Sequence, residues 1–441
     1  MSLLNYLLGR SGDERLLWTG EGWKTVADAC IIARQIRAAH TDLEGARVLL
    51  CPQNDVEMIF GLLAFDGFVD QMLLIAGNTT DDEIKQMRER CTVDRVVDLS
   101  FSEFVDLTIE ADGEIDEVRN TKWIVPTSGT TGTPKLVAHT LDSLAFTVRR
   151  NQTVGSDLVW GMIYDVTRFA GIQVLLQAVI GSSGLAVVND RQDVSTAALQ
   201  FSKAGVNALS ATPTMWRKLV MSGVIDALDL RIITMGGEPA DQKILDELIG
   251  RFPKAKVTAI YASTEAGVGF SVSDGLAGFP SDYEKGKLRG GNQLRVLDGK
   301  LLLRKVTEGG TYVGIDESIT DTKGWIDTGD LVEKRGERYH FLGRASGAIN
   351  VGGQKVHPTE VERIIDKVPG VSMVVVSGRR NPIMGSLVEA HVVALKGVQT
   401  DKLKEHILQA CRVHLAGYKG PASIKFLDDI PTTLAGKIKR K

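Results

Sequence analysis

The nine residues Thr127-Ser128-Gly129-Thr130-Thr131-Gly132-Thr133-Pro134-Lys135 combine hydroxyls, glycines and a lysine. Glycine lets backbone amides approach a phosphate closely, and hydroxyls and an ammonium add further donors. The short apolar run 122–126 ahead of them predicts a strand that enters a loop. In the usual nucleotide P-loop, Lys and Ser or Thr follow the last glycine directly, and this stretch departs from that pattern. Such clusters also form ordinary turns, but the full order favours a phosphate-binding loop.

The composition sets broad limits on the class of protein. The chain has 441 residues, 43% of them hydrophobic and 24% charged, which predicts two or three globular domains. A formal net charge of −3 argues against nucleic acid as the main partner. The basic run 437–441 is typical of a solvated tail.

The cysteines and the N-terminus indicate a compartment. The four cysteines are scattered without metal-ligand spacing, which predicts reduced thiols and no structural metal. The N-terminus lacks the basic region and apolar run of a signal peptide, and no stretch of about 18 apolar residues occurs. We therefore expect a cytoplasmic protein without a membrane span.

Strand-like and helical patterns alternate along most of the chain. Helical patterns at 25–39, 54–65, 81–90, 170–180 and 195–204 alternate with short apolar runs, which predicts an α/β fold with mostly parallel sheets. From about residue 290 the pattern changes to short strands, with an Asp298-Gly299 hairpin turn. We expect a large N-terminal domain at 1–342, including this small β-rich part, and a small α+β domain at 343–441.

Two polar turns follow buried-type strands. Gly236-Gly237-Glu238-Pro239 follows the run 230–235, and Tyr261-Ala262-Ser263-Thr264-Glu265 follows the run 256–260. Ligands of open α/β sheets bind at the carboxyl ends of strands. An aromatic ring is a suitable platform for a nucleobase, and a carboxylate with phosphate oxygens suits Mg²⁺. Taken alone, Tyr261 would be a half-buried core tyrosine.

These segments occur in the order of the adenylate-forming superfamily, which includes acyl-CoA synthetases, luciferases and peptide-synthetase adenylation domains, and the resemblance covers nearly the whole chain. It also includes Trp325-Ile326-Asp327-Thr328-Gly329-Asp330-Leu331, which resembles the family's ribose-binding segment. The resemblance implies that the 127–135 loop binds phosphates and that Asp330 accepts hydrogen bonds from the ribose hydroxyls. The ATP- or AMP-binding residues that it implies are Thr127, Ser128, Gly129, Thr130, Thr131, Gly132, Gly237, Glu238, Pro239, Tyr261, Ala262, Ser263, Thr264, Asp330, Phe341, Arg344 and Lys437.

The resemblance also implies the catalytic groups and a mobile C-terminal domain. The catalytic residues are Lys437 and Lys135, together with Glu265, which would hold Mg²⁺ with Thr127. Without the resemblance, Lys437 would be a solvated lysine near the terminus. The small domain rotates in this family, and the hinge position, usually Asp or Lys, is Ser346 here.

The thiol channel and its surroundings follow the hinge. The resemblance implies that Gly352 and Gly353 line the channel for the thiol acceptor. His357 precedes Pro358, a position that favours a structural or surface role over that of a catalytic base.

The acid pocket is implied by the same resemblance and departs from the family in two places. Its candidate residues are Arg168, Phe169, Gly171, Gly236 and Tyr261. Arg168 stands where many relatives have a histidine, so it either binds an acidic group of the substrate or makes a structural salt bridge. Ala262 replaces the usual glycine beside the tyrosine.

The resemblance implies an AMP-forming ligase. A carboxylic acid and ATP would form an acyl-adenylate and pyrophosphate, and a thiol would then take the acyl group. Coenzyme A is the favoured acceptor, and a phosphopantetheinyl carrier protein acting in trans is the alternative. A degenerate adenylate-binding regulatory protein is a further alternative, against which Glu265, Asp330, Arg344 and Lys437 all argue.

Overall fold

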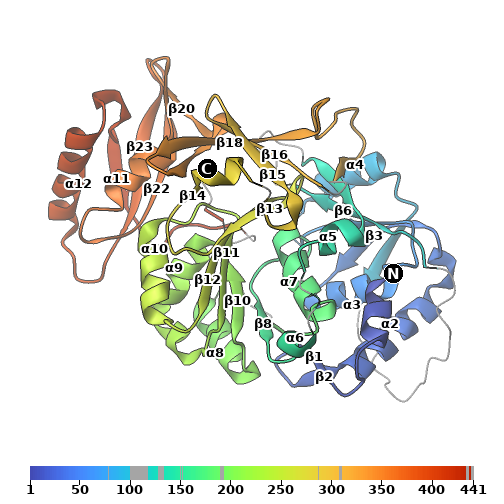
Figure 1. Cartoon of the computed structure of the whole chain (residues 1–441). Coiled ribbons are helices and arrows are strands. Elements are labelled where there is room, and N and C mark those ends of the chain that lie inside the picture. The colour runs from blue at the N-terminus through green and yellow to red at the C-terminus, as the bar shows by residue number, and fades with distance from the viewer. Residues whose placement is uncertain are drawn as a thin grey trace. The chain divides into compact units, whose positions relative to one another are not determined.

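The computed structural model shows an α/β chain with a small α+β C-terminal part (Figure 1). It describes residues 1–77, 79–99, 118–127, 134–148, 150, 152–188, 193–286, 288–306, 310–433 and 437–438. By its contacts the chain forms two units. Unit 1 contains residues 1–277, 287–293 and 304–326, and unit 2 contains residues 278–286, 294–303 and 327–441. This division does not test a hinge, so the boundary at Gly343 stays a prediction.

The first sheet of unit 1 carries the ends of the expected phosphate loop. Its strands follow the order β17-β7-β6-β4-β3-β5, in which β5, β3, β4 and β6 are parallel and β7 and β17 are antiparallel. The bounds are β3 Arg47–Pro52, β4 Gln71–Leu74, β5 Arg95–Leu99, β6 Lys122–Pro126, β7 Leu136–His139 and β17 Thr311–Tyr312. Because β7 returns beside β6, the two ends of the loop are held together.

The second sheet of unit 1 carries both polar turns. Its order is β13-β12-β11-β10-β8-β9-β1-β2, with antiparallel strands at the two edges and parallel strands between them. The bounds are β1 Arg15–Trp18, β2 Trp23–Thr25, β8 Val159–Met162, β9 Gly184–Val187, β10 Ala208–Ala211, β11 Ile232–Gly236, β12 Lys256–Ser263 and β13 Gly267–Val272. Gly236 pairs with Ile260, so the two polar turns leave adjacent strands at the same edge.

Helices pack against these sheets and begin at residues that cap them. Thr25 and Thr80 form capping boxes, and Thr212 caps a helix that has Pro213 in its first turn. In Figure 1 the helices α8, α9 and α10 lie beside β10, β11 and β12. The helix bounds are α1 Leu3–Leu8, α2 Val26–Ala39, α3 Asp55–Phe65, α4 Asp81–Cys91, α5 Leu141–Ala145, α6 Gln152–Gly155, α7 Phe169–Val179, α8 Val194–Ala204, α9 Pro213–Ser222 and α10 Gln242–Arg251.

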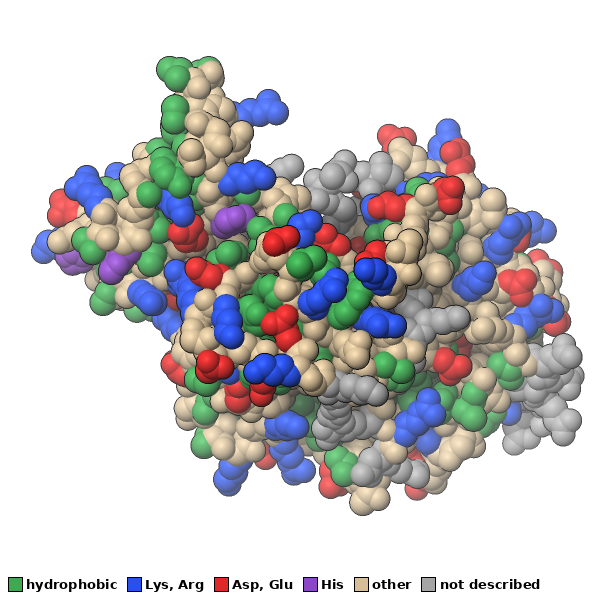
Figure 2. Space-filling model, turned by 45° about the horizontal axis from the view of Figure 1, so that its top comes forward, with side chains coloured by type: hydrophobic (Ala, Val, Ile, Leu, Met, Phe, Trp, Pro, Cys, Tyr) green, Lys and Arg blue, Asp and Glu red, His purple; other side chains and the backbone are tan. Residues whose placement is uncertain are grey.

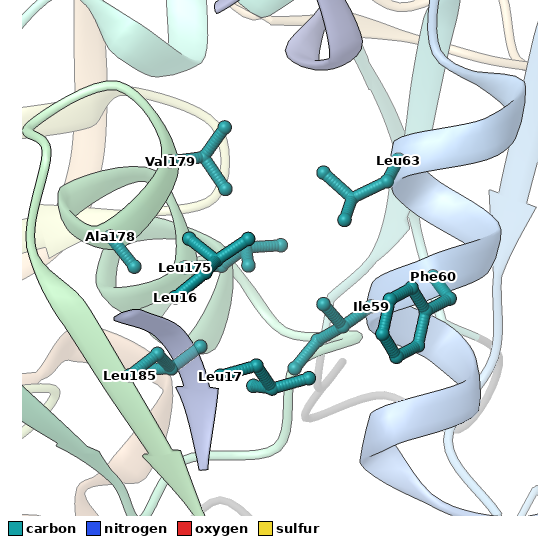
Figure 3. A pocket seen from close by; sticks show the side chains of 9 residues that line it. All are labelled: Leu16, Leu17, Ile59, Phe60, Leu63, Leu175, Ala178, Val179 and Leu185. Carbon is teal, nitrogen blue, oxygen red and sulfur yellow. The ribbon is translucent and has the colours of Figure 1, made fainter. Parts of the chain in front are cut away.

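The largest core of unit 1 surrounds α3. Nearly all of this helix is buried, because its sequence is apolar on every side. A small space between α3, α7, β1 and β9 is lined entirely by apolar side chains (Figure 3). The lining residues are Leu16, Leu17, Ile59, Phe60, Leu63, Leu175, Ala178, Val179 and Leu185. They present no polar group to a ligand, so this space is a packing gap in the core.

The β-rich sheet has the strand order β14-β19-β18-β16-β15. Asp298 and Gly299 both adopt positive φ, at 49° and 75°, as the expected primed hairpin turn requires. The bounds are β14 Phe279–Pro280, β15 Gln293–Leu297, β16 Lys300–Arg304, β18 Trp325–Arg335 and β19 Arg338–Arg344. Most of this sheet belongs to unit 2.

The C-terminal part of unit 2 packs two helices on a further sheet. The bounds are β20 Ile349–Val351, β21 Gln354–Val356, α11 Pro358–Ile365, β22 Val371–Asn381, β23 Gly385–Ala394, α12 Thr400–His414 and β24 Ser423–Phe426. Short 3₁₀ turns lie at Thr41–Leu43, Val224–Ala227, Ser281–Glu284, Arg289–Gly291, Ala345–Gly347 and Gly417–Lys419. The α+β character expected for this part of the chain is thus present.

Two surface properties bear on the expectations. Among the described helices, none is both long and apolar enough to cross a bilayer. Figure 2 shows Lys and Arg side chains interspersed with Asp and Glu side chains over the face in view. The expectation that nucleic acid is not the partner stays a prediction.

The packing of Gly171 against the turn before α7 can be tested by substitution. A Cβ there would overlap the backbone carbonyl of Asp165, so Gly171→Ala should force α7 away from the preceding turn and lower the free energy of unfolding by about 3 kcal/mol. Gly250 in α10 is a matched control, since its Cβ would meet nothing within 4 Å. Gly250→Ala should raise stability by about 1 kcal/mol. Urea unfolding of both variants and of wild type measures these free energies. Equal values for the two variants would contradict the close approach of Gly171 to the Asp165 carbonyl.

Candidate functional site

The base of the expected phosphate loop is closed by hydrogen bonds. Thr127 N donates to Lys135 O at 2.8 Å, and Arg90 Nη1 donates to Pro134 O at 2.9 Å. Ser128, Gly129, Thr130, Thr131 and Gly132 lie outside the described residues. Both described ends of the loop are therefore fixed to the first sheet, and the phosphate-binding role of the loop stays a prediction.

Lys135 lies in a cluster that the sequence analysis did not find. Its Nζ is 2.8 Å from Glu317 Oε2 and 4.5 Å from the centroid of the Tyr312 ring. The hydrogen bond that Lys135 donates to Glu317 raises the pKa of Lys135, so the ammonium is charged. Burial, and then the negative charge of Glu265, raises the pKa of Tyr312. Lys135, Tyr312, Glu317 and Glu265 therefore share one electrostatic environment.

The end of β12 and the turn after it hold an aromatic ring, that of Tyr261, and a carboxylate, that of Glu265, both half-buried. The ring of Tyr261 stacks on that of Phe270 in the neighbouring strand, with centroids 5.0 Å apart and planes 15° from parallel. Phe270 therefore supports Tyr261 from one side. Glu265 at the end of the turn and the Thr127 hydroxyl are oxygen donors of the kind that Mg²⁺ prefers. These residues fit the expected base platform and metal ligands.

His139 joins the two sheets of unit 1. It is 3% exposed at the end of β7, and its Nε2 is 2.8 Å from Thr264 O, immediately before Glu265. Burial lowers the pKa of His139 to about 4, so the imidazole is neutral, and Nε2 carries the proton because a carbonyl can only accept. His139 thereby holds the Glu265 turn beside the strand that leaves the phosphate loop. The sequence analysis missed it, since its partner lies 125 residues away.

The turn after β11 is attached to α9. Glu238 Oε2 accepts hydrogen bonds from Thr214 N at 3.2 Å and from Thr214 Oγ1 at 2.6 Å. Gly237 has a φ of +81°, which a glycine tolerates best. The Glu238 carboxylate therefore positions the turn. The adenine contacts expected of Gly237, Glu238 and Pro239 stay predictions.

The expected pocket residues around α7 differ in their roles. Arg168 precedes α7, and its Nη1 donates to Pro126 O at 3.0 Å, which fixes the strand before the phosphate loop. Among the ion pairs of the described residues, Arg168 takes part in none, so the structural salt bridge considered from the sequence is not found there. Phe169 packs 5.9 Å from the His139 ring. A glycine is required at position 171, because a Cβ there would overlap the backbone carbonyl of Asp165.

In unit 2 the expected ribose-binding residues lie opposite one another. Asp330 in β18 pairs with Arg344 in β19, and Arg344 Nε is 3.6 Å from Asp330 Oδ1. Asp330 N donates to Thr328 Oγ1, which itself donates to Leu301 O. Phe341 packs on Phe279, with centroids 5.6 Å apart. Register between two antiparallel strands thus joins residues 14 apart along the sequence.

The C-terminal motifs of unit 2 are placed by turns. Gly352 and Gly353 have φ of +58° and +87° in the turn between β20 and β21, and Ser346 is exposed in a 3₁₀ turn. Lys437 N donates to Thr433 Oγ1 at 3.3 Å, and Thr433 N donates to Lys437 O at 2.8 Å.

The end of the chain packs on unit 2 through an isoleucine. Ile438, next to Lys437, packs against the buried cluster that contains Met373 and Ile430. Lys437 is thus held on the domain by its neighbours. The hinge, thiol-channel and catalytic roles of these residues stay predictions.

His139 makes stability depend on pH. The folded pKa of His139, about 4, lies below the ordinary 6.5. Between these two pH values the imidazole is therefore protonated in the unfolded chain and neutral in the folded chain. The free energy of unfolding should therefore fall by about 3 kcal/mol as the pH drops from 6.5 to 4. His139→Gln should remove that part of the slope. His406→Gln, which replaces an exposed histidine, should leave the pH dependence of the free energy of unfolding as in wild type. Identical pH profiles for the two variants would contradict this assignment.

Two family models match the chain. The AMP-binding enzyme model matches residues 27–313, which is more than half of the chain, and the AMP-binding enzyme C-terminal domain model matches residues 360–437. The gap between the two matches contains Asp330 and Arg344.

Curated relatives and solved structures agree with the family models. The 2-succinylbenzoate–CoA ligase of Bacillus subtilis (strain 168) is 27% identical, over 91% of this chain and 88% of the relative. A feruloyl-CoA synthase of Amycolatopsis sp. is also 27% identical, over 71% and 67%. An anthranilate CoA ligase solved with anthranoyl-AMP has a TM-score of 0.81 at 18% identity, covering 99% of this chain and 95% of its own.

A second solved structure contains the ligands expected for such a fold. The o-succinylbenzoate CoA synthetase of Bacillus subtilis, in complex with ATP and magnesium, has a TM-score of 0.75 at 23% identity, covering 100% of this chain and 98% of its own. ATP, coenzyme A and Mg²⁺ are expected for this family. The chain therefore belongs to the AMP-binding enzyme family, as an AMP-forming acid–thiol ligase of the acyl-CoA synthetase type.

Proposed function

We propose that the chain activates an aromatic carboxylic acid and transfers it to coenzyme A. The observation that carries this proposal is the double contact of His139, whose ring packs on Phe169 and whose Nε2 bonds Thr264 O. An aromatic wall therefore lies beside the turn that bears Glu265. The ring of Tyr261, in β12 just before this turn, adds a second aromatic surface. The relatives named for 2-succinylbenzoate and ferulate act on acids with aromatic rings, which supports the same substrate class.

The charged residues fit the two half-reactions. In the first, a substrate carboxylate oxygen bonds to the α-phosphorus of ATP as the bond to the β-phosphate oxygen breaks, and pyrophosphate leaves. In the second, the thiol releases its proton, its sulfur bonds to the acyl carbon, and the bond from that carbon to the phosphate oxygen breaks, so that AMP leaves. The substrate carboxylate and the phosphates of ATP repel one another, so cations must offset their charge. Transfer to a phosphorus depends chiefly on positioning and on electrostatic stabilisation. Lys135 and Lys437 would supply charge, Tyr261 would hold the base, and Asp330 would hold the ribose.

Bound Mg²⁺ would offset phosphate charge. Glu265 and the Thr127 hydroxyl are the residues proposed to hold it, together with phosphate oxygens. The hydrogen bond from His139 to Thr264 O would keep Glu265 oriented for this role.

Pyrophosphate release tests the substrate class. Aryl, medium-chain fatty and dicarboxylic acids should be compared with and without coenzyme A. We expect the fastest release with an aromatic acid, strongly increased by coenzyme A, and the matching acyl-CoA as product. Adenylate formation unaffected by coenzyme A would indicate a carrier protein as acceptor. If no acid of the panel causes pyrophosphate release, a degenerate adenylate-binding protein would be favoured.

Lys437 tests the catalytic assignment. Lys437→Ala should slow adenylate formation about 100-fold or more, roughly 3 kcal/mol of barrier, because a charge placed at the transition state is lost. AMP affinity should change little. Lys396→Ala is the control, since Lys396 is an exposed lysine of the same unit. Wild-type rates of pyrophosphate release by Lys437→Ala would show that the role proposed for Lys437 is wrong.

A further inference from the structure

Lys305 lies at the expected acid pocket and was not singled out by any motif. It follows β16 and belongs to unit 1. Gly267 has a φ of +63°, and a Cβ on it would lie 2.9 Å from Lys305 Nζ and 3.8 Å from Phe169 Cζ. The ammonium and the aromatic wall of the pocket therefore meet over Gly267, two residues after Glu265. The positive charge of Lys305 also contributes to the low pKa of His139.

Among the residues that the structure describes, no carboxylate balances the Lys305 ammonium. Among the described residues, Nζ makes no hydrogen bond or ion pair, although the side chain is largely removed from solvent. Burial lowers the pKa of Lys305, with no opposing effect from an acidic neighbour. An ammonium in such a place is costly unless it is paired. Its partner is therefore best supplied by a ligand.

Two nearby cations are engaged elsewhere. Lys135 is paired with Glu317, and Arg168 donates to the backbone oxygen of Pro126. These contacts leave Lys305 as the best-placed cation for the acyl part of the substrate. The contact that Arg168 makes with Pro126 O supports the strand before the phosphate loop.

We propose that Lys305 binds a second carboxylate of the acid substrate, distinct from the carboxylate that is activated. This inference rests on the proposed function, because it places the rest of the acid against Phe169. On adenylation the activated carboxylate becomes an acyl group without charge of its own, because the one remaining negative charge of the mixed anhydride lies on the phosphate of AMP. The acyl end would therefore leave Lys305 unpaired again. A second carboxylate keeps the ion pair through both half-reactions. The substrate class is thus an aromatic acid with two carboxylates.

A matched pair of acids isolates the second carboxylate. 2-Succinylbenzoate has a carboxylate on the ring and another on the chain, whereas 3-benzoylpropionate retains the ring, the ketone and the chain carboxylate alone. Wild type should show a kcat/KM about 10- to 100-fold higher for 2-succinylbenzoate, the range expected for a hydrogen bond to a charged group. Lys305→Met should lose most of this ratio by lowering the value for 2-succinylbenzoate alone, and Lys305→Arg should retain part of it.

Control measurements separate binding from folding. Lys300→Met removes an exposed lysine at the start of β16 whose partner is the exposed Asp327, and should keep the wild-type ratio. Lys305→Met should melt no lower than wild type, because removing an unpaired charge costs no stability. Calorimetric titration of both acids into wild type and Lys305→Met reports on affinity without turnover.

The outcomes distinguish this inference from the proposed function. An unchanged ratio in Lys305→Met, or an equal loss for both acids, overturns the role of Lys305. Turnover of the two acids at equal rates by wild type overturns it as well, while leaving aromatic-acid activation intact. If wild type turns over neither acid, titration still decides: a preference for 2-succinylbenzoate that Lys305→Met abolishes supports the inference, and absence of that preference overturns it.

Discussion

The hydrogen bond from the buried His139 to Thr264 O is the contact on which the arrangement of unit 1 depends. His139 ends β7 in the first sheet, and Thr264 follows β12 in the second. Because burial keeps the imidazole neutral, the link costs no buried charge. It places the loop that begins at Thr127, the carboxylate of Glu265 and the ring of Phe169 in one neighbourhood. Phosphate, metal and acyl group are the three components that an adenylation site must bring together.

Charge pairing separates the residues of this site into two groups. Lys135 with Glu317, and Asp330 with Arg344, are already paired within the chain, and each pair is partly exposed to solvent. Such pairs contribute little to stability and are easily exchanged for a ligand. Lys305 differs, because the described residues supply it with no anion. A group already paired within the chain can exchange its partner for a ligand, whereas the role proposed for Lys305 follows from its having no anion among the described residues.

Much of the fold and part of the site could be predicted from the sequence. Hydrophobic periodicity predicted α2, α7 and α8 close to their observed bounds, because amphipathic spacing directly reports which face is buried. The turn at Asp298-Gly299 was predicted from these two residues alone, since a primed hairpin turn requires positive φ at both positions and Asp and Gly adopt it more readily than other residues. Asp330 and Arg344 were found in local motifs, and strand register brings them together.

Other residues could not be placed in this way. Glu317 is 182 positions from Lys135, and Phe270 supports Tyr261 from another strand, so no local pattern signals either contact. Gly171 was assigned to the pocket, but its small size is required by the backbone of Asp165.

The sequence by itself determined the family, the order of the elements and the residue types available for chemistry, because motifs and periodicity are local properties of the chain. Only the tertiary structure decided which of those groups are paired. The Glu238 carboxylate binds the start of α9, Arg168 binds the end of β6, and the Lys305 ammonium lies beside Gly267. The physical reason is that burial and pairing depend on residues brought together from distant parts of the chain, and these two quantities set what a charged side chain can do.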